Sequence, residues 1–313
     1  MTGHPVPRLG IHLQNFQEDD HPDWARLLAN AEAADRSGID KLVVSDHVAF
    51  GERLDEYARP EVGGVAGGRQ PTGPDGHWLE PVTLMSFLAG RTTNVRFASH
   101  VLLAALRRPI VLAKSLSTLD VLADGRIDIG VGVGWQREEY DAAGLPFDDR
   151  GRLLDECLDL CTTMWRDRAA TITAGDATVE RIHQMPKPVQ PGGVPIWISG
   201  RVSRRVARRL VRFGTGWIPW GDDADDLATS LPRLRRMMTD EGGDPGGLRV
   251  VGNLPTQTGA DGSRDVPSTM AVAEQLVDAG ATDLVARLPV AASESAEEVF
   301  GLWAEAFHRR FRT

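Results

Sequence analysis

Cysteine and lysine are both scarce in this chain of 313 residues. The two cysteines, Cys157 and Cys161, lie four residues apart on an expected helix. Redox pairs and metal sites have closer spacings or nearby histidines, so we expect both thiols to be buried and unreactive. Only three of the 35 basic residues are lysines, and this bias towards arginine indicates a GC-rich genome.

Long apolar runs and an excess of positive charge are also absent. No apolar stretch is long enough to span a bilayer, and Met1–Leu9 lacks the apolar core of a secretion signal. The net charge is −9, whereas proteins that bind nucleic acids or membrane surfaces present basic surfaces. No spacing of histidine, cysteine and carboxylate residues is typical of a metal site. We therefore expect a cytoplasmic protein that binds a small-molecule substrate, and no metal, nucleic acid or membrane.

Short apolar strands alternate with amphipathic helices along the whole chain. The expected strands are Leu9–Leu13, Asp40–Val44, Val95–Leu103, Arg126–Val131, Val194–Ile198, Gly216–Ile218, Leu248–Val251 and Asp283–Arg287. The expected helices are Asp23–Ser37, Glu80–Thr92, Pro109–Ala123, Phe147–Trp165, Ser203–Phe213, Asp222–Asp240, Pro267–Ala279 and Ser295–Arg310. Eight such repeats predict one domain over residues 1–313, an α/β fold of the (β/α)8 TIM-barrel type with insertion loops. The alternative, a doubly wound open sheet, requires a glycine-rich loop after the first strand, which Leu9–Gln14 lacks.

Two segments are too long to be plain connections. Ala49–Leu79 is rich in glycine and proline and follows a strand, so it lies on the face where barrel active sites form. We interpret it as a substrate lid, the alternative being a floppy insertion. Its residues Tyr57, His77 and Trp78, with Glu80, suggest a partly aromatic pocket with a carboxylate, although the aromatics can equally pack the lid onto the barrel. Asp167–Gly193 is of mixed composition.

Polar residues follow directly after the second expected strand. Ser45, Asp46 and His47 lie at the carboxyl end of that strand, on the rim where barrel enzymes place catalytic groups. Histidine can donate or accept a proton near neutral pH, and a carboxylate can accept a hydrogen bond from a ring N–H of a cofactor. We take Asp46 and His47 as candidate catalytic residues, and a helix cap or a loop network is the alternative.

A glycine-rich run, Gly130–Trp135, follows the fourth expected strand. Its spacing is not that of a dinucleotide-binding loop, but Gly132 and Gly134 allow a planar ring or a phosphate to approach the backbone closely. Of Glu138 and Glu139, which come next, we expect one to face the pocket and the other to be solvated. Glu138 is our candidate for the residue that contacts a cofactor.

A polar turn after the fifth expected strand is a candidate anion site. Ser199, Gly200, Arg201 and Val202 lead into a helix whose first N–H groups are unsatisfied, which favours a phosphate there. Arginines of this helix can meet a phosphate or a polyacid tail, but we expect three of them to lie on a solvated face: Arg208, Arg209 and Arg212. Two other strands carry further candidates for the pocket, Ser99, His100 and Val101 on the third and His12 and Gln14 on the first.

Several motifs lie at consistent points of this pattern. They are Arg107-Arg108-Pro109, Leu112–Leu116, Leu119–Leu122, Gly125-Arg126, Gly130–Trp135, Glu138–Tyr140, Asp149–Gly151, Pro186–Gln190, Pro195–Gly200 and Gly214–Trp217. Together they resemble the luciferase-like monooxygenase superfamily and, within it, the F420-dependent oxidoreductases. The resemblance covers roughly residues 9–220, and the last third of the chain carries few motifs.

The resemblance implies a (β/α)8 barrel, usually a homodimer, with the cofactor ring at the carboxyl ends of the strands. In F420 enzymes of this kind the residues matching Ser45, Asp46 and His47 approach the deazaflavin. Members often have a non-proline cis peptide in the third strand, here between His100 and Val101. The family's phosphate turn corresponds to 199–202.

The chain departs from the family pattern at three positions. His100 stands where a small residue is common, and Thr215 stands where aspartate is common. Trp135 replaces the catalytic glutamate of some members that act on sugar phosphates, so the resemblance does not imply that chemistry here.

The function implied by the resemblance is an F420-dependent oxidoreductase that transfers a hydride between the deazaflavin and a small organic substrate. His47 is the candidate proton donor or polar anchor, and Asp46 is the candidate ring ligand. An FMN-dependent monooxygenase on the same barrel is the first alternative, because both cofactors share a tricyclic ring and a ribityl phosphate. The arginine-rich composition suits an actinobacterial host that makes F420. The second alternative is a non-catalytic protein that binds flavin or deazaflavin.

Overall fold

Eight parallel strands close into a barrel in this computed structural model, which describes residues 6–312. The barrel strands are β1 (Arg8–His12), β3 (Lys41–Val44), β5 (Arg96–Leu102), β6 (Ile127–Val131), β9 (Ile196–Gly200), β10 (Gly214–Pro219), β11 (Arg249–Leu254) and β14 (Asp283–Ala286). Their order around the barrel is β1-β14-β11-β10-β9-β6-β5-β3. Each overlaps an expected strand, so the (β/α)8 prediction is confirmed and the open-sheet alternative is wrong.

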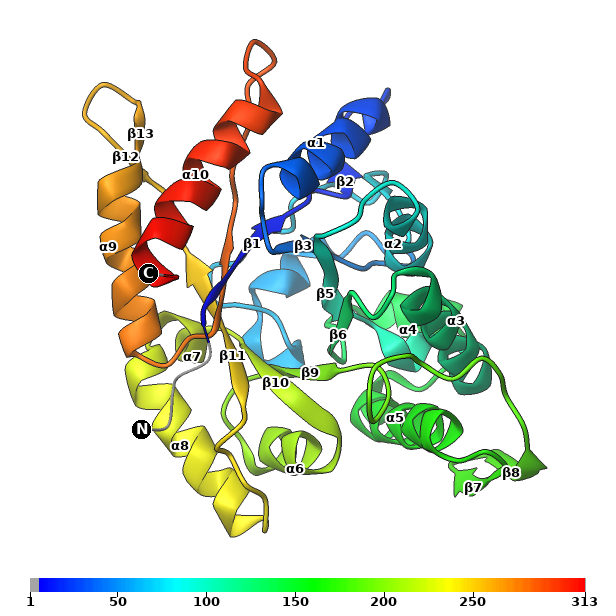
Figure 1. Ribbon diagram of the computed structural model, residues 1–313. Coiled ribbons are helices and arrows are strands. Elements are labelled where there is room, and N and C mark those ends of the chain that lie inside the picture. Colours follow the sequence, from blue (N-terminus) through cyan, green and yellow to red (C-terminus); the bar gives the residue numbers. More distant parts are fainter. Residues whose placement is uncertain (1–5, 313) are drawn as a thin grey trace.

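Helices surround the barrel on its outside, as Figure 1 shows. They are α1 (Trp24–Arg36), α2 (Pro81–Ala89), α3 (Pro109–Leu122), α4 (Arg137–Ala142), α5 (Arg150–Arg166), α6 (Arg204–Phe213), α7 (Asp222–Asp225), α8 (Leu227–Asp240), α9 (Val266–Asp278) and α10 (Ala296–Phe311). The expected helix over Asp222–Asp240 is in fact two helices, because Asp226 leaves the helical conformation and caps α8 through the amide of Thr229.

Three two-stranded antiparallel sheets lie outside the barrel. They are β2 (Phe16–Gln17) with β4 (His77–Trp78), β7 (Ala170–Ala174) with β8 (Ala177–Ile182), and β12 (Gln257–Thr258) with β13 (Arg264–Asp265). The β7–β8 hairpin lies beside α5 and accounts for much of the 167–193 segment. The β2–β4 pair anchors one end of the predicted lid to the chain that leaves β1.

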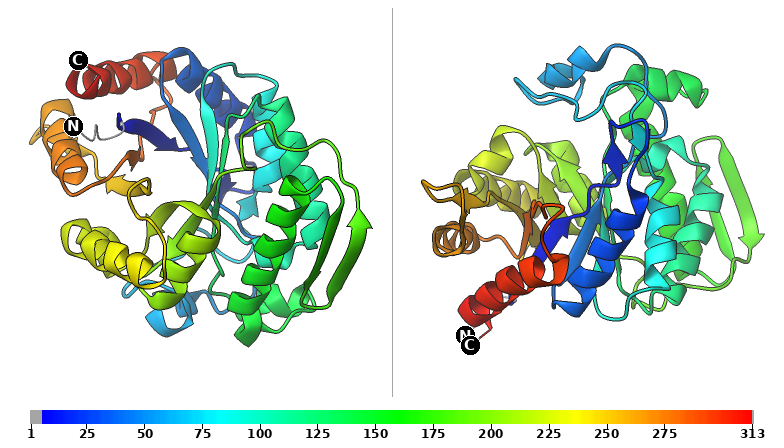
Figure 2. Two further views of the ribbon diagram at one scale, coloured as in Figure 1. Left: turned by 60° about the horizontal axis from the view of Figure 1, so that its bottom comes forward. Right: turned by 90° about the horizontal axis from the view of Figure 1, so that it is seen from above.

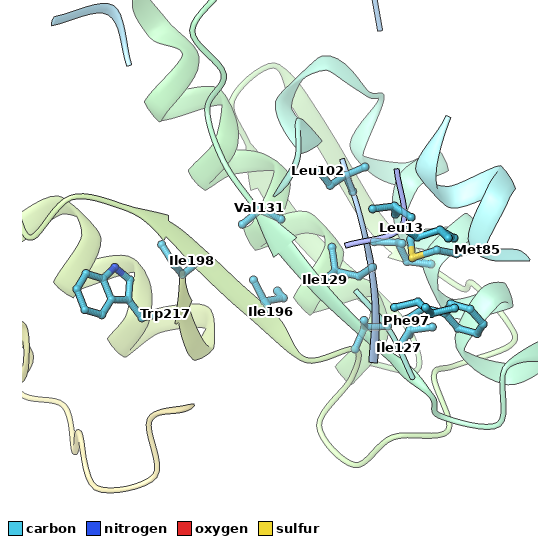
Figure 3. Close-up of a cluster of buried hydrophobic side chains, with 14 of the residues drawn as sticks. Leu13, Met85, Phe97, Leu102, Ile127, Ile129, Val131, Ile196, Ile198 and Trp217 are labelled. Carbon is cyan, nitrogen blue, oxygen red and sulfur yellow. The ribbon is translucent and has the colours of Figure 1, made fainter. Parts of the chain in front are cut away.

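The main core lies between the strands and the helices. Side chains alternate along a strand, so β6 directs Ile127, Ile129 and Val131 outwards, and β9 does the same with Ile196 and Ile198. Figure 3 shows these side chains together with Phe97 and Trp217 of other barrel strands and Met85 of the surrounding helix α2. Both cysteines are buried and unpaired in this layer, which confirms that prediction.

A second, smaller core fills the inside of the barrel. Trp197, Ile218 and Val251 are buried there, with Val101 and Val285 packed against them. Beyond Trp197, the amino ends of the strands carry a layer of charge. The Nζ of Lys41 lies 2.9 Å from Asp128 and 2.7 Å from Asp283, and all three side chains are almost completely buried.

Two arginines complete this charged layer. Arg96 contacts Asp128 at 2.9 Å and Arg249 contacts Asp283 at 2.8 Å. The amino end of the barrel is therefore filled by ion pairs. Functional groups belong at the opposite, carboxyl end, which is where barrel enzymes place them.

We predict that Gly130→Ala destabilises the barrel. A Cβ at Gly130 would lie 2.5 Å from Cδ1 of Ile218 and closer still to the carbonyl oxygen of Ser99, which belongs to the backbone of the neighbouring strand. The free energy of unfolding should fall by about 1–3 kcal/mol, measured by urea titration. Gly301→Ala is the matched control, because nothing lies near a Cβ there and alanine in α10 should add about 0.5–1 kcal/mol. Equal stabilities of the two variants would contradict the prediction.

None of the helices in the described part of the chain combines the length and apolar character that a bilayer-spanning segment needs. The expectation about a secretion signal in 1–9 falls partly on residues 1–5, which lie outside the described residues.

Candidate active site

The segment between β3 and α2 lies over the carboxyl end of the barrel. It contains two short 3₁₀ helices, Leu54–Ala58 and Pro60–Val62, which project in light blue beyond one end of the barrel in Figure 2. Several hydrogen bonds tie this segment to the rim, and two of them involve the side chains of Arg53 and Trp220. Arg53 Nε donates to Glu138 at 2.6 Å, and Trp220 Nε1 donates to the carbonyl oxygen of Gly63 at 3.1 Å.

Aromatic rings connect the lid segment to the end of β3. The His47 ring lies 4.4 Å from Phe50 and 4.9 Å from Trp78, and Trp135 lies 6.0 Å away, all measured between centroids. The Tyr57 ring of the lid meets Trp135 edge-on at 5.4 Å. The His47 ring is therefore packed among aromatic rings, and about a tenth of its side chain is exposed.

His47 and Glu139 form a hydrogen-bonded pair at the rim. The Nδ1 of His47 lies 3.1 Å from Oε2 of Glu139, whose side chain is completely buried. The other carboxylate oxygen, Oε1, accepts the amide of Val48 at 2.8 Å. With Nδ1 directed at the carboxylate, Nε2 is the nitrogen left to exchange a proton, and it has no hydrogen-bond partner within residues 6–312.

The two neighbouring glutamates have different partners. Glu138, the candidate from the sequence, pairs with Arg53 of the lid, and Glu139 pairs with His47. The sequence analysis did not predict helix α4 and therefore did not decide which of the two glutamates faces inwards. The amphipathic pattern of this turn would have distinguished them, because Glu139 and Tyr140 are buried whereas Arg137 and Glu138 are not.

Asp46 is completely buried and both its oxygens accept hydrogen bonds. Oδ2 accepts the amide of Leu103 at 2.8 Å and Nη1 of Arg107 at 2.6 Å, and Oδ1 accepts Nη2 of Arg107 at 3.0 Å. Arg107 also reaches Glu80 at 2.7 Å. Asp46 thus joins the turn after β3 to the turn after β5, which sets the position of the adjacent His47.

The backbones of β5 and of the turn after β6 approach each other closely at the same end of the barrel. The His100–Val101 peptide is cis, as the resemblance implied, and the register between β5 and β6 shifts between Ser99 and Leu102. A Cβ at Gly132 would lie 2.5 Å from Cγ2 of Val101, so glycine permits the close approach of the two strands. Ser99 itself is fully buried and donates to the carbonyl oxygen of Gly130 at 2.9 Å.

Gly134, the other glycine candidate, has a positive φ of 71° and lies beside Leu103 and Tyr140. Its conformation, which glycine adopts readily, turns the chain from β6 towards α4. It therefore contributes to the position of Glu139.

Two histidines face the barrel axis near the same end. His12 lies 3.0 Å from the hydroxyl of Ser45, measured from Nε2 to Oγ. Burial lowers the pKa of His12 to about 4 and that of His100 to about 3. Both rings are therefore neutral at pH 7, so they offer hydrogen bonds to a ligand without adding charge.

The predicted phosphate turn is only partly available. The side chains of Ser199, Arg201 and Val202 are half-buried, and the amides of Arg201 and Ser203 have no acceptor among the described residues. The amide of Val202, however, donates to Oδ2 of Asp223 in α7 at 2.7 Å. The carboxylate of Asp223 thus accepts one of the N–H groups of the turn and places a negative charge beside it.

The arginines of α6 are engaged away from this turn. Arg208 pairs with Glu241, Arg212 with Asp159 and Arg209 with Asp155. The expectation of a solvated face is wrong for Arg209, whose side chain is 7% exposed because α6 packs it against α5. A hollow of about 260 Å³ at these arginines and another of about 600 Å³ along α8 lie on the outer surface, away from the barrel end.

The carboxyl end of the barrel is open to solvent. Gln14, Asn253 and Arg287 follow the inward-facing alternation of their strands and are nevertheless exposed. Within residues 6–312, no three histidine, cysteine or carboxylate side chains lie close enough together to hold a metal ion. The end therefore combines exposed polar side chains with the aromatic rings that pack around His47.

Known proteins share this architecture. An uncharacterised protein of Mycobacterium tuberculosis is 26% identical over 228 residues, which cover 70% of this chain and 74% of that protein. An F420-dependent secondary alcohol dehydrogenase in complex with an F420–acetone adduct superimposes with a TM-score of 0.73 at 15% identity, over 96% of this chain and 98% of its own. The oxygenating constituent of the FMN-bound 3,6-diketocamphane monooxygenase of Pseudomonas putida gives 0.70 at 14% identity, over 96% and 97%.

At these identities the two solved structures show the fold alone. The family model described as luciferase-like monooxygenase, by contrast, matches residues 8–309, nearly all of the chain. Its match takes in the strands and turns that carry His47, Glu139 and Gly132. The chain belongs to the luciferase-like monooxygenase family of (β/α)8-barrel oxidoreductases.

Proposed function

We propose that this protein is an F420-dependent oxidoreductase that reduces a carbonyl or unsaturated organic substrate. The observation that carries the proposal is the hydrogen-bonded pair of His47 and Glu139 at the carboxyl end of the barrel, the end where β5 leads into the cis His100–Val101 peptide. A bound reduced deazaflavin supplies a hydride, and the reaction then needs a proton at the substrate. His47 Nε2 supplies that proton, and Glu139 stabilises the protonated ring and fixes its orientation.

The residues present fit a planar cofactor with a phosphate tail. The cis His100–Val101 peptide lies beside Gly132, where the backbones of two strands approach closely, and we place the three-ring system at this part of the barrel end. The unsatisfied amides of Arg201 and Ser203 fit a phosphate at the start of α6. We therefore assign cofactor binding to His100, Val101 and Gly132 and to the turn at 199–202.

Three candidates from the sequence have positioning roles in this proposal. Asp46 holds Arg107 and the amide of Leu103, and so fixes the turn that carries His47. Ser99 ties β5 to β6 directly before the cis peptide. Glu138 holds the lid through Arg53, which keeps water from the reacting atoms when the lid is closed.

Titration of the purified apoprotein with F420 and with FMN tests the choice of cofactor. We expect F420 to bind at least about tenfold more tightly, a difference of roughly 1.4 kcal/mol. The arginine-rich composition, which suits a GC-rich host, supports this choice. Preferential binding of FMN would favour the monooxygenase alternative. Tight binding without turnover on a panel of ketones and enones would favour a non-catalytic binding protein.

Asp223→Asn should strengthen binding of the phosphate-bearing cofactor. The substitution removes the negative charge that lies against the amide of Val202, so a phosphate on the turn meets less repulsion. We expect a dissociation constant about threefold to tenfold lower, measured by fluorescence titration. Asp225→Asn is the control, because Asp225 is an exposed residue of the same short helix without a contact to the turn. The same gain in both variants would place the phosphate elsewhere.

A further inference from the structure

One sector of the barrel end carries an arginine that the proposed reaction does not use. In β14, Asp283 and Val285 face the barrel axis, since Asp283 pairs with Lys41 and Val285 packs inside the barrel. The register of β1 on β14 sets Gly10 opposite Val285 and Ile11 opposite Ala286. Arg287 therefore faces the axis one step above Val285, beside His12 on the neighbouring strand.

Arg287 has no charged partner of its own. Its side chain is exposed, and no carboxylate lies within salt-bridge distance of it in residues 6–312. Its positive charge helps to lower the pKa of His12, and it partly offsets the rise that burial causes in the pKa of Tyr57. The charge of the guanidinium thus acts on an axis-facing histidine and on a tyrosine of the lid segment.

The groups around Arg287 leave its charge uncompensated. His12 is neutral at pH 7, and Asn253 on the adjacent strand β11 is uncharged and exposed. Glu80, the carboxylate that the sequence suggested for the pocket, is occupied by Arg107 and by the amide of Thr83. An arginine that is open to a ligand and lacks a carboxylate partner favours an anion, which its guanidinium can bind through two hydrogen bonds.

Aromatic contacts run from Tyr57 of the lid segment to the reacting end of the site. Tyr57 meets Trp135 at 5.4 Å, and Trp135 meets His47 at 6.0 Å. A ligand that touches both Arg287 and His47 therefore passes along a wall of aromatic rings. The phosphate turn, by contrast, follows β9, which is separated from β14 by β10 and β11.

We propose that Arg287 binds the carboxylate of the substrate, so that the substrate class is keto acids and unsaturated acids with an apolar or aromatic body. This inference rests on the proposed function, because it specifies which carbonyl or unsaturated compounds His47 would protonate. The acid group lies at Arg287, the body lies along Tyr57 and Trp135, and the reducible bond lies at His47.

Matched pairs of acids and amides test the proposal. Phenylpyruvate and trans-cinnamate, each beside its primary amide, are titrated into the protein with and without saturating cofactor. Tryptophan fluorescence reports binding, since Trp78 and Trp135 line the site. We expect each acid to bind the wild-type protein about tenfold more tightly than its amide.

Three variants separate charge from structure. Arg287→Gln should remove the preference for the acid, and Arg287→Lys should retain part of it. Arg236→Gln, on the exposed face of α8, changes the net charge equally and should leave the preference intact. All three should unfold at the wild-type urea concentration, because Arg287 has no partner to lose.

Equal affinity for acid and amide, or no saturable binding of either, would overturn the proposal. So would an Arg287→Gln variant that keeps the preference, or one that loses affinity for F420 alone, since the arginine would then serve acid groups of the cofactor. If the protein binds F420 but binds acids no more tightly than amides, this inference is wrong and the proposed function still holds. An acid preference without cofactor binding supports the anion site and removes the proposed function.

Discussion

Replacing His47 with asparagine is expected to slow oxidation of the bound reduced cofactor by about 10²–10⁴-fold, the usual contribution of a placed proton donor. The asparagine side chain retains a hydrogen-bonding group near Glu139 but cannot deliver a proton near neutral pH. Stopped-flow absorbance after mixing with a ketone substrate measures the rate. The dissociation constant of the cofactor should be nearly unchanged, because the proposed cofactor contacts lie on β5, β6 and β9.

Two adjacent glutamates give this prediction a matched control. Glu139→Gln should slow the same step strongly, because the neutral amide neither stabilises a protonated His47 nor specifies its tautomer. Glu138→Gln changes the net charge equally but affects only the contact with Arg53 of the lid. Equal rates of cofactor oxidation in the two variants would contradict the prediction, because the hydrogen bond between His47 and Glu139 would then not contribute to catalysis.

Lys41→Met should destabilise the protein by about 3–5 kcal/mol at pH 7. The substitution leaves Asp128 and Asp283 buried at the amino end of the barrel, each with one arginine in place of two cations. Urea unfolding measures the loss. Arg36→Ala breaks an ion pair whose side chains are 55% and 54% exposed, and it should change stability by less than about 1 kcal/mol. A similar small loss for Lys41→Met would show that the layer is not a stabilising network.

The same layer predicts how stability depends on pH. Burial alone would raise the pKa values of Asp128 and Asp283, but Lys41 with Arg96 or Arg249 holds both well below 3.8, the value of an unperturbed aspartate. A carboxyl group with a lowered pKa in the folded state stabilises the fold above its unfolded value and loses that effect as the pH falls. Wild-type stability should therefore decline below about pH 4. The difference in free energy of unfolding between the wild type and Lys41→Met should become smaller below this pH. Protonation neutralises the two aspartates and so removes the cost of burying their charges without Lys41.

The barrel itself was predictable because each strand has a short apolar run bounded by turn residues. Val43, Ile129 and Ile198 lie in runs of this kind, and the helices between them show the expected amphipathic spacing. The family motifs also identified the cis peptide at His100–Val101, which no local pattern would reveal. These features depend on residues that are close together in the chain.

Pairings across the barrel were not predictable. Glu139 is 92 residues from its partner His47, and Lys41 is 242 residues from Asp283. A charged residue at the start of a strand has the same local pattern whether it faces solvent or the barrel axis. Closure of the sheet decides this, so the charged layer appeared only with the structure. Asp223, which meets the phosphate turn from a helix of four residues, is a third case.

Because Trp197 and the charged layer fill the amino end of the barrel, the site in residues 6–312 is accessible only from the carboxyl end. Ligands therefore enter and leave at the carboxyl end, past the exposed side chains of Gln14, Asn253 and Arg287 and the segment that Arg53 and Gly63 hold. Incoming and outgoing molecules therefore compete for one passage. Turnover at high product concentration should be limited by this shared route, and loosening the lid should relieve that limit before it affects the chemical step.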